Sequence, residues 1–166
     1  MSAESTPRIV VRHAARVVLI DDLDRLLLFL FRFTPADGVL RELWITPGGG
    51  LDPDETHEAA ATRELWEETG ISVSLGPCVW TRSFTGPWDD HFIEQHERYF
   101  VARTPARGIE TTNQTQFERV LMPEHRWWSI DEIRASSDVF APGALAEALV
   151  PLIAGEYPPE PIDVGA

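Results

Sequence analysis

Three glutamates crowded into the last turns of one helix constrain this chain more than any other feature of its sequence. A helix is predicted from Thr56, a suitable N-cap, to Gly70, which suits the left-handed position after a helix. Near its end lie Glu64, Glu67 and Glu68. A helix C-terminus carries about half a negative charge, so each carboxylate there costs about 0.3–1 kcal/mol. Residues at i, i+3 and i+4 also share one face and repel. A bound cation would remedy both problems, and the alternative is a solvated acidic face.

The residues around these glutamates have a defined spacing. Fixed residue types occur at Gly49, Glu55, Arg63, Glu64, Leu65, Glu67, Glu68, Gly70 and Ile71. This pattern matches the Nudix box, so the chain resembles the Nudix hydrolase family over residues 47–71. Segments 97–100 and 126–129 are similar to late strands of that fold. One departure is Asp54, since a glycine commonly precedes the box glutamate, and this puts the local loop geometry in question.

Clustered carboxylates form an all-oxygen site, which suits Mg²⁺ or Mn²⁺. Zinc is disfavoured because no histidine or cysteine lies within the glutamate cluster. The resemblance implies that Glu64, Glu67 and Glu68 are metal ligands, together with the backbone carbonyl of Gly48. A glycine run such as 47–50, Pro-Gly-Gly-Gly, lets the backbone approach a ligand closely.

Other site residues follow from the same resemblance. Glu55 is expected to be the outer carboxylate of the box, binding through water or orienting Arg63, which holds the glutamates in place. The alternative for Arg63 is a plain surface ion pair of small value. The general base is either Glu64 within the box or an acid from a later loop, with Glu118 preferred there and Glu124 as its competitor.

Substrate-binding residues are the least constrained part of the prediction. The aromatic side chains that could stack on a base are Trp44, Phe84, Trp88 and Tyr99, although aromatic residues in strands are more often core. Arg82 and Arg98 could meet phosphates or be surface charges. Pro87 follows Ile71 at a distance similar to that of a proline in ADP-sugar members of the family, a hint toward ADP-ribose-like substrates.

The order of predicted elements favours one α/β domain. Strands are expected over residues 15–20, 26–33, 43–46, 71–73, 79–84, 92–102 and 127–130, and helices over 56–69, 131–135 and 144–153. The expected fold is α/β, a Nudix-type α/β/α sandwich with a mixed β-sheet. Residues 1–12 are predicted to be a flexible lead-in, 13–156 the Nudix domain, and 157–166 a proline-rich tail.

Composition excludes several classes of protein. The net charge of −13 argues against a nucleic-acid polymer as partner. Cys78 is the only cysteine, which excludes an intrachain disulfide and a cysteine-based zinc site. The apolar run 26–31 is too short to cross a membrane, which needs about 20 residues, and residues 1–8 do not resemble a signal peptide. A cytoplasmic location is therefore expected, and a homodimer is compatible with the resemblance.

The predicted function is a metal-dependent pyrophosphohydrolase that cleaves a nucleoside diphosphate linked to another moiety, by attack of water at phosphorus. One alternative is a non-catalytic Nudix module that senses a nucleotide. Another is an isomerase of the isopentenyl-diphosphate type, which normally needs a catalytic cysteine, and Cys78 lies just beyond the box.

Overall fold

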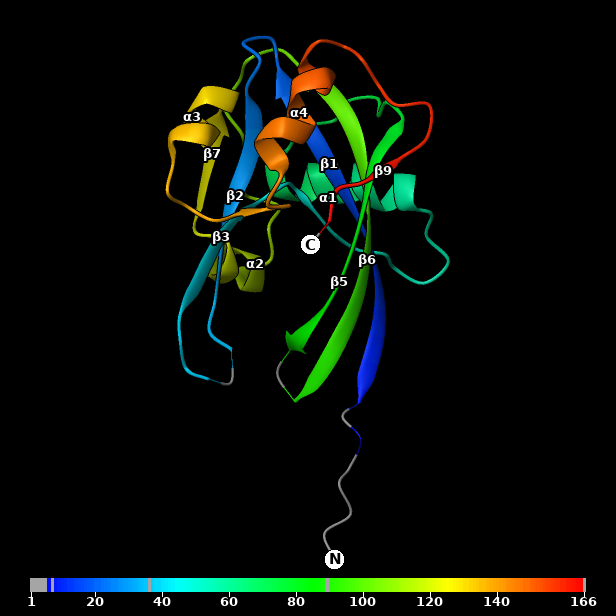
Figure 1. Ribbon diagram of the computed structural model, residues 1–166, viewed down its shortest axis with the longest axis vertical. Coiled ribbons are helices and arrows are strands. Elements are labelled where there is room, and N and C mark those ends of the chain that lie inside the picture. Colours follow the sequence, from blue (N-terminus) through cyan, green and yellow to red (C-terminus); the bar gives the residue numbers. More distant parts are fainter. Residues whose placement is uncertain (1–5, 7, 36, 89, 166) are drawn as a thin grey trace, which may run out of the picture.

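The computed structural model describes residues 6, 8–35, 37–88 and 90–165 (Figure 1). A mixed β-sheet forms its centre. Its strands are β1 (Ile9–Asp21), β2 (Leu26–Phe33), β3 (Arg41–Ile45), β4 (Gly48–Gly50), β5 (Cys78–Trp88), β6 (His91–Thr104), β7 (Glu124–Trp128), β8 (Phe140–Ala141) and β9 (Ile162–Asp163). The helices are α1 (His57–Thr69), α2 (Gln116–Leu121), α3 (Ile130–Ala135) and α4 (Leu145–Ile153).

The strands of the described chain run in the order β8-β3-β2-β1-β6-β5-β9, with β4 also paired to β1 and β7 to β2. The two longest strands, β1 and β6, pair in parallel along the whole of β1. β2 is antiparallel to both β3 and β7. The sheet is therefore mixed, which confirms the predicted fold class. No helix in the described residues is long and apolar enough to cross a membrane.

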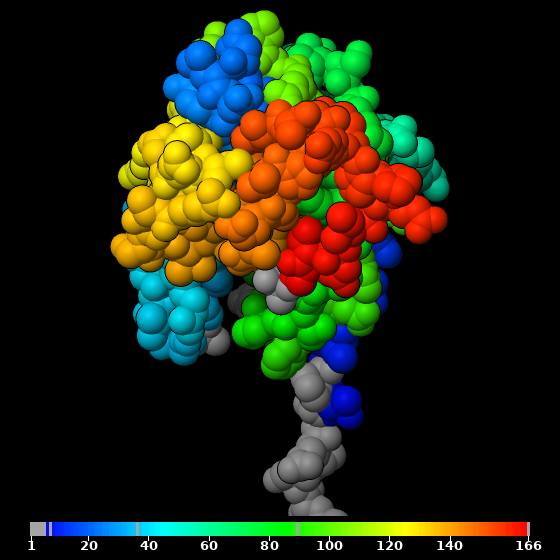
Figure 2. All heavy atoms as spheres, turned by 45° about the horizontal axis from the view of Figure 1, so that its top comes forward, coloured from blue at the N-terminus to red at the C-terminus, as the bar shows by residue number. Residues whose placement is uncertain are grey.

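Two apolar clusters cover the two faces of the sheet. Along β1, Val18 packs in the cluster beneath α3 and α4, whereas its neighbour Val17 packs in the cluster beneath α1. This alternation follows from the two-residue period of a strand, and it explains why β1 and β2 are almost continuously apolar. Figure 2 shows α4 lying between α3 and the C-terminal segment on one face of the molecule.

Both predicted ends of α1 are confirmed. The Thr56 side chain accepts a hydrogen bond from the backbone N–H of Ala59 at 3.1 Å. Gly70 adopts the left-handed conformation with φ +71°, and its N–H donates to the carbonyl of Trp66 at 2.8 Å. These caps fix the end of the helix, and with it the position of the acidic residues of the last turns.

The strand predicted over residues 71–73 is wrong. The N–H of Ile71 donates to the Thr69 hydroxyl at 3.0 Å, so it is not available for a sheet hydrogen bond. The Ile71 side chain is nevertheless fully buried in the cluster beneath α1. An apolar residue that only fills the core therefore produced the appearance of a strand.

Four elements of the described chain were not predicted, among them the two-residue strands β8 and β9. The glycines Gly48–Gly50 form β4, antiparallel to residues 14–16 of β1. The stretch read as a polar loop contains α2, whose Thr115 and Glu118 form a reciprocal capping box. Short helices of this kind depend on their caps, since six residues provide little propensity.

The predicted domain limits differ from the strands at both ends. β1 begins at Ile9, so residues 9–12 of the expected lead-in are sheet, while residues 1–5 and 7 lie outside the described chain. In the predicted tail, β9 pairs in parallel with β5. At each end, therefore, a paired strand extends the sheet beyond the predicted domain limits of residues 13 and 156.

Candidate active site

The last turns of α1 lie against the glycines of β4. Glu68 is 1% exposed, and its Oε2 accepts a hydrogen bond from the N–H of Gly48 at 3.2 Å. A Cβ at Gly49 would lie 2.6 Å from Oε1 of Glu64. A Cβ at Gly48, where φ is +150°, would lie 2.3 Å from the carbonyl oxygen of Ala15. Glycine at these positions therefore lets two carboxylates and a neighbouring strand approach the same backbone.

Three carboxylates meet at this point. Glu64 and Glu68 from α1 and Glu118 from α2 each offer an oxygen within 4.8 Å of the others. Glu118 was the preferred acid outside the box, and the structure brings it to the box glutamates although it is 50 residues further along the chain. Glu124, its competitor, is exposed on β7 at the position paired with Leu30.

Burial and mutual repulsion raise the pKa values of two of these carboxyls. For Glu68, burial is the largest cause and the charge of Glu64 adds to it, so the pKa lies well above its usual value despite the nearby Arg16. For Glu64, burial again raises the pKa, Arg63 opposes this, and Glu67 adds to it. The cluster therefore holds more negative charge than its protein surroundings compensate.

Arg63 organises the box carboxylates. Its Nε and Nη2 donate to the two oxygens of Glu55, at 2.9 and 2.8 Å. Its Nη1 donates to Glu64 at 3.1 Å and to Glu67 at 3.2 Å, and Nη2 also reaches the carbonyl of Gly50 at 3.2 Å. The hydrogen bond from Arg63 lowers the pKa of Glu55 to about 2. This geometry has the features expected for Glu55 and Arg63, whereas Glu67 is bound to Arg63 and is not one of the three clustered carboxylates.

The residue before Glu55 explains how the box tolerates its departure from the family pattern. Asp54 has φ +64°, in the left-handed region that favours glycine. Aspartate enters this region more readily than most residues. The loop therefore keeps the turn that a glycine would make.

A cavity of about 610 Å³, here called the apolar cleft, opens beside the cluster. Glu64, Glu68 and Glu118 lie on its wall. Its apolar lining includes Phe31, Phe33, Leu43, Ile45, Phe84, Pro87, Trp88, Ile93, Phe117 and Leu121. Figure 2 shows the β2–β3 loop and the end of the β5–β6 hairpin as separate lobes below the helices, and residues of both lobes line the cleft.

A buried ionic network forms part of the cleft lining. Glu97, 2% exposed, accepts hydrogen bonds from Arg16, Arg82, Gln95 and Tyr99, at 2.8, 3.2, 2.7 and 2.6 Å. The Nε of Arg82 is buried and makes no hydrogen bond within the described residues. The Arg82 guanidinium also lies 4.4 Å from the ring centroid of Phe84. The network therefore places the Arg82 guanidinium in the lining of the cleft, with one donor that no protein group in the described residues satisfies.

The four predicted substrate contacts separate into two groups. Arg82 and Tyr99 line the apolar cleft. Trp44 packs instead on Trp128 in the core, with its Nε1 bonded to Asp138 at 3.1 Å. Arg98 lies between Glu97 and Tyr99 on β6 and is exposed. Because successive side chains of a strand point to opposite faces, Arg98 lies on the face away from the cleft.

Several lining residues were missed by sequence reasoning. Arg16 is a charge within an apolar strand, and Gln95 and Glu97 alternate along β6 with the predicted Tyr99. A charged residue in a buried strand needs a partner, so this pattern was a usable signal. Phe117 gave no such signal, because it is a single aromatic residue in a polar stretch.

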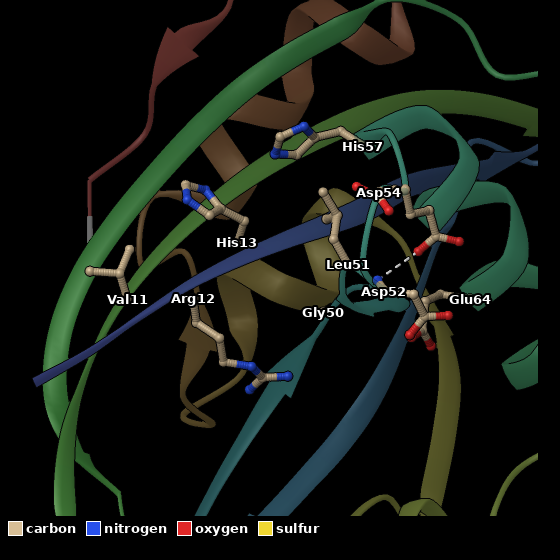
Figure 3. Close-up of a pocket in the computed structure, with 10 residues that line it drawn as sticks. Val11, Arg12, His13, Gly50, Leu51, Asp52, Asp54, His57 and Glu64 are labelled. Atoms are coloured by element: carbon tan, nitrogen blue, oxygen red, sulfur yellow. Dashed lines mark hydrogen bonds between the residues drawn. The ribbon is translucent and has the colours of Figure 1, made fainter.

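A second pocket of about 730 Å³, here called the polar pocket, lies on the other side of the β4–α1 turn (Figure 3). It is lined by Val11, Arg12, His13, Gly50, Leu51, Asp52, Asp54, Glu55, His57 and Glu64. Arg12, Gly50 and Glu64 line both cavities. Cys78 lines neither cavity, although it is part of the described chain, and an isomerase would need a cysteine at the site.

The mixed sandwich and its carboxylate-bearing helix define a hydrolase site of the Nudix type. A family model for the NUDIX domain matches residues 11–148. The chain is 34% identical over 129 residues to Phosphatase NudJ of Escherichia coli strain K12, with 74% of each chain covered. The chain therefore belongs to the Nudix hydrolase family, and it is an enzyme that acts on phosphoanhydride bonds.

Solved structures show the same fold. A MutT protein from Methanosarcina mazei Go1 superposes with a TM-score of 0.61 at 18% identity, covering 92% of this chain and 98% of that one. The NUDIX domain of Shewanella oneidensis NrtR, solved with ADP ribose, gives 0.63 at 19% identity, covering 87% and 89%. At these identities the comparison concerns the fold alone.

The residues present fit a divalent metal ion. All the donor atoms of the cluster are carboxylate oxygens, the chemistry that hard cations prefer. Burial first, and the charges of neighbouring carboxylates second, raise the pKa values of Glu64 and Glu68, so their charged forms are disfavoured without a cation. A cation at the cluster would remove that penalty.

Proposed function

We propose that this protein is a metal-dependent pyrophosphohydrolase that cleaves a nucleoside diphosphate linked to another moiety. The observation that carries this proposal is the meeting of Glu64, Glu68 and Glu118 at the wall of a cleft large enough for a nucleotide. Mg²⁺ or Mn²⁺ would be held by these three carboxylates and, by family resemblance, by the Gly48 carbonyl and Glu67. When bound, the metal would neutralise charge that develops on the phosphoryl oxygens.

The reaction needs a base for the attacking water. Glu64 and Glu118 both fit this role, since each carboxylate lies in the cluster and lines the apolar cleft. One of them accepts a proton from the water as its oxygen bonds to phosphorus and the anhydride P–O bond breaks. The products are two phosphorylated fragments, one of them a nucleoside monophosphate.

The apolar cleft supports a nucleotide as the substrate. Phe84 and Trp88 offer aromatic surfaces for stacking on a base, and Arg82 and Tyr99 offer polar contacts beside them. Pro87, the residue that hinted at an ADP-ribose-like substrate, also lines this cleft. An NrtR NUDIX domain of the same fold was solved with ADP ribose. ADP-ribose-like compounds are therefore the first substrates to test. The cytoplasmic location and the homodimer stay predictions.

A turnover screen tests the proposal. The purified protein is incubated with ADP-ribose, other nucleotide sugars, dinucleoside polyphosphates, deoxynucleoside triphosphates and coenzyme A, each with Mg²⁺, Mn²⁺ or a chelator. We expect hydrolysis of a substituted nucleoside diphosphate that stops with the chelator.

Matched variants complete the screen. Glu68→Gln should reduce the rate by at least about 10²-fold, because a metal ion contributes several kcal/mol and each 1.4 kcal/mol is tenfold. Glu58→Gln, an exposed glutamate of the same helix, is the control. Turnover that is indifferent to the chelator, or equal in Glu68→Gln, would refute the proposal.

A further inference from the structure

Five arginines line the two cavities or hold the carboxylates between them, and four are already paired. Arg41 is bound to Asp37 at 2.5 Å. Arg16 and Arg82 share Glu97, at 2.8 and 3.2 Å. Arg63 is held by Glu55, Glu64 and Glu67. Arg12 makes no ion pair and no side-chain hydrogen bond within the described part of the chain. It is therefore the cation at this site whose charge remains for an anion.

Arg12 also lies where the two cavities join. Its strand pairs with β4 so that Ala14 is the partner of Gly50. A Cβ at Gly50 would lie 2.9 Å from Nη2 of Arg12, so the guanidinium rests against a residue that has no side chain. Arg12 and Glu64 flank Gly50 in Figure 3, and both line the apolar cleft and the polar pocket.

The strand pairing places Arg12 beside a residue of the apolar cleft. Its partner on β6 is Gln95, which lines the cleft and donates to Glu97. On the other side, the polar pocket contains His13, His57 and acidic side chains of the β4–α1 loop. A diphosphate at the carboxylate cluster, with a group attached at each end, would pass beside Arg12.

We propose that Arg12 binds a phosphate of the substrate diphosphate at the junction between the cleft and the polar pocket. The inference rests on the proposed function. A guanidinium offers parallel N–H donors that match two oxygens of one phosphate. The carboxylates of the cluster would hold a metal ion that neutralises one side of the diphosphate, and Arg12 neutralises phosphate oxygens that face away from the cluster. The group beyond that phosphate then lies in the polar pocket, whose histidines and carboxylates suit a sugar-like polar moiety.

Calorimetric titration with imidodiphosphate, a non-hydrolysable diphosphate, tests this role in the presence of Mg²⁺. Arg12→Gln should weaken binding about tenfold or more, the value of one charge-assisted contact, and Arg12→Lys should weaken it less. Arg8→Gln is the matched control, because Arg8 is exposed four residues away on the same segment and lines neither cavity. Thermal unfolding should be unchanged in all three variants.

The outcomes separate this inference from the proposed function. Equal affinity in the wild type and Arg12→Gln, equal weakening in Arg8→Gln, or no binding by the wild type would each overturn the role of Arg12. Binding that depends on Arg12 in a protein that hydrolyses none of the screened compounds would support the phosphate site and refute the hydrolytic substrate class. Hydrolysis whose KM does not change in Arg12→Gln would support the proposed function and refute the role of Arg12.

Discussion

Arg16 donates from Nε to Oε1 of Glu97 across 2.8 Å, in the lining of the apolar cleft. The Glu97 side chain is 1% exposed and that of Arg16 is 13% exposed, so this is a largely desolvated ion pair. Glu97 also accepts from Arg82 and Tyr99. One buried carboxylate therefore fixes three side chains of the cleft, two of which are candidates for substrate contact.

Removing that carboxylate should destabilise the whole domain. Glu97→Gln leaves Arg16 and Arg82 buried without their counter-ion, a loss of about 3–5 kcal/mol. Urea unfolding measures this loss. Glu94→Gln, on the same strand but partly exposed beside His96, should change stability by less than about 1 kcal/mol. Equal stability of the two variants would show that the buried network contributes little.

Acid should destabilise the protein by protonating Glu97. Burial raises the pKa of Glu97, but the charge of Arg16 and the hydrogen bond from Tyr99 outweigh it and lower the pKa to about 2. The unfolded value is about 4.3. The stabilisation from Glu97 is therefore complete above about pH 4.3 and is lost as the pH falls toward 2. Thermal unfolding across this range should show a shallower slope in Glu97→Gln, and an unchanged slope would contradict the assignment.

Replacing Gly48 of β4 should lower stability, whereas replacing Gly49 should lower activity. Gly48→Ala places a Cβ 2.3 Å from the Ala15 carbonyl at a φ of +150°, so the variant should unfold at a much lower temperature. Gly49→Ala meets only the end of the Glu64 side chain, so it should fold but lose activity. Gly108→Ala is the control for both, because no atom lies within 4 Å of the added Cβ and Gly108 is exposed and lines neither cavity. A fully active Gly49→Ala would argue against a precise position for Glu64.

Arg63 should not be replaceable by lysine. A lysine cannot donate to both oxygens of Glu55 while also contacting Glu64 and Glu67. Arg63→Lys should fold and lose about 10–100-fold in metal affinity, as is typical when residues that orient metal ligands are changed. Titration with Mn²⁺ measures this. If Arg63→Lys bound Mn²⁺ with wild-type affinity, Arg63 would be a surface charge without a role in orienting the metal ligands.

The sequence predicted what depends on local pattern. The caps at Thr56 and Gly70 fixed α1, and the apolar periods of β2 and α4 gave their positions to within a residue. Asp54 could not be resolved in this way, since only the backbone shows that it takes the left-handed turn of a glycine.

Long-range contacts were harder to predict. Glu118 joins the box glutamates only because α2 forms and packs near β2. The Thr115–Glu118 capping box is a local signal for α2, but no local pattern predicts its packing against β2. Trp44 and Tyr99 look alike as strand aromatics. Both belong to the same buried cluster, but the Tyr99 hydroxyl donates to Glu97 and Tyr99 also lines the cleft, whereas Trp44 packs on Trp128.

Metal uptake at the carboxylate cluster tests the central claim most directly. Mn²⁺ titration of the wild type, Glu68→Gln and the exposed control Glu58→Gln should show binding in the wild type and the control. Glu68→Gln should fold, because burial raises the pKa of Glu68 and so disfavours a charged side chain there. It should bind Mn²⁺ at least about tenfold more weakly. A folded wild type that takes up neither Mn²⁺ nor Mg²⁺, with or without imidodiphosphate, would contradict this account.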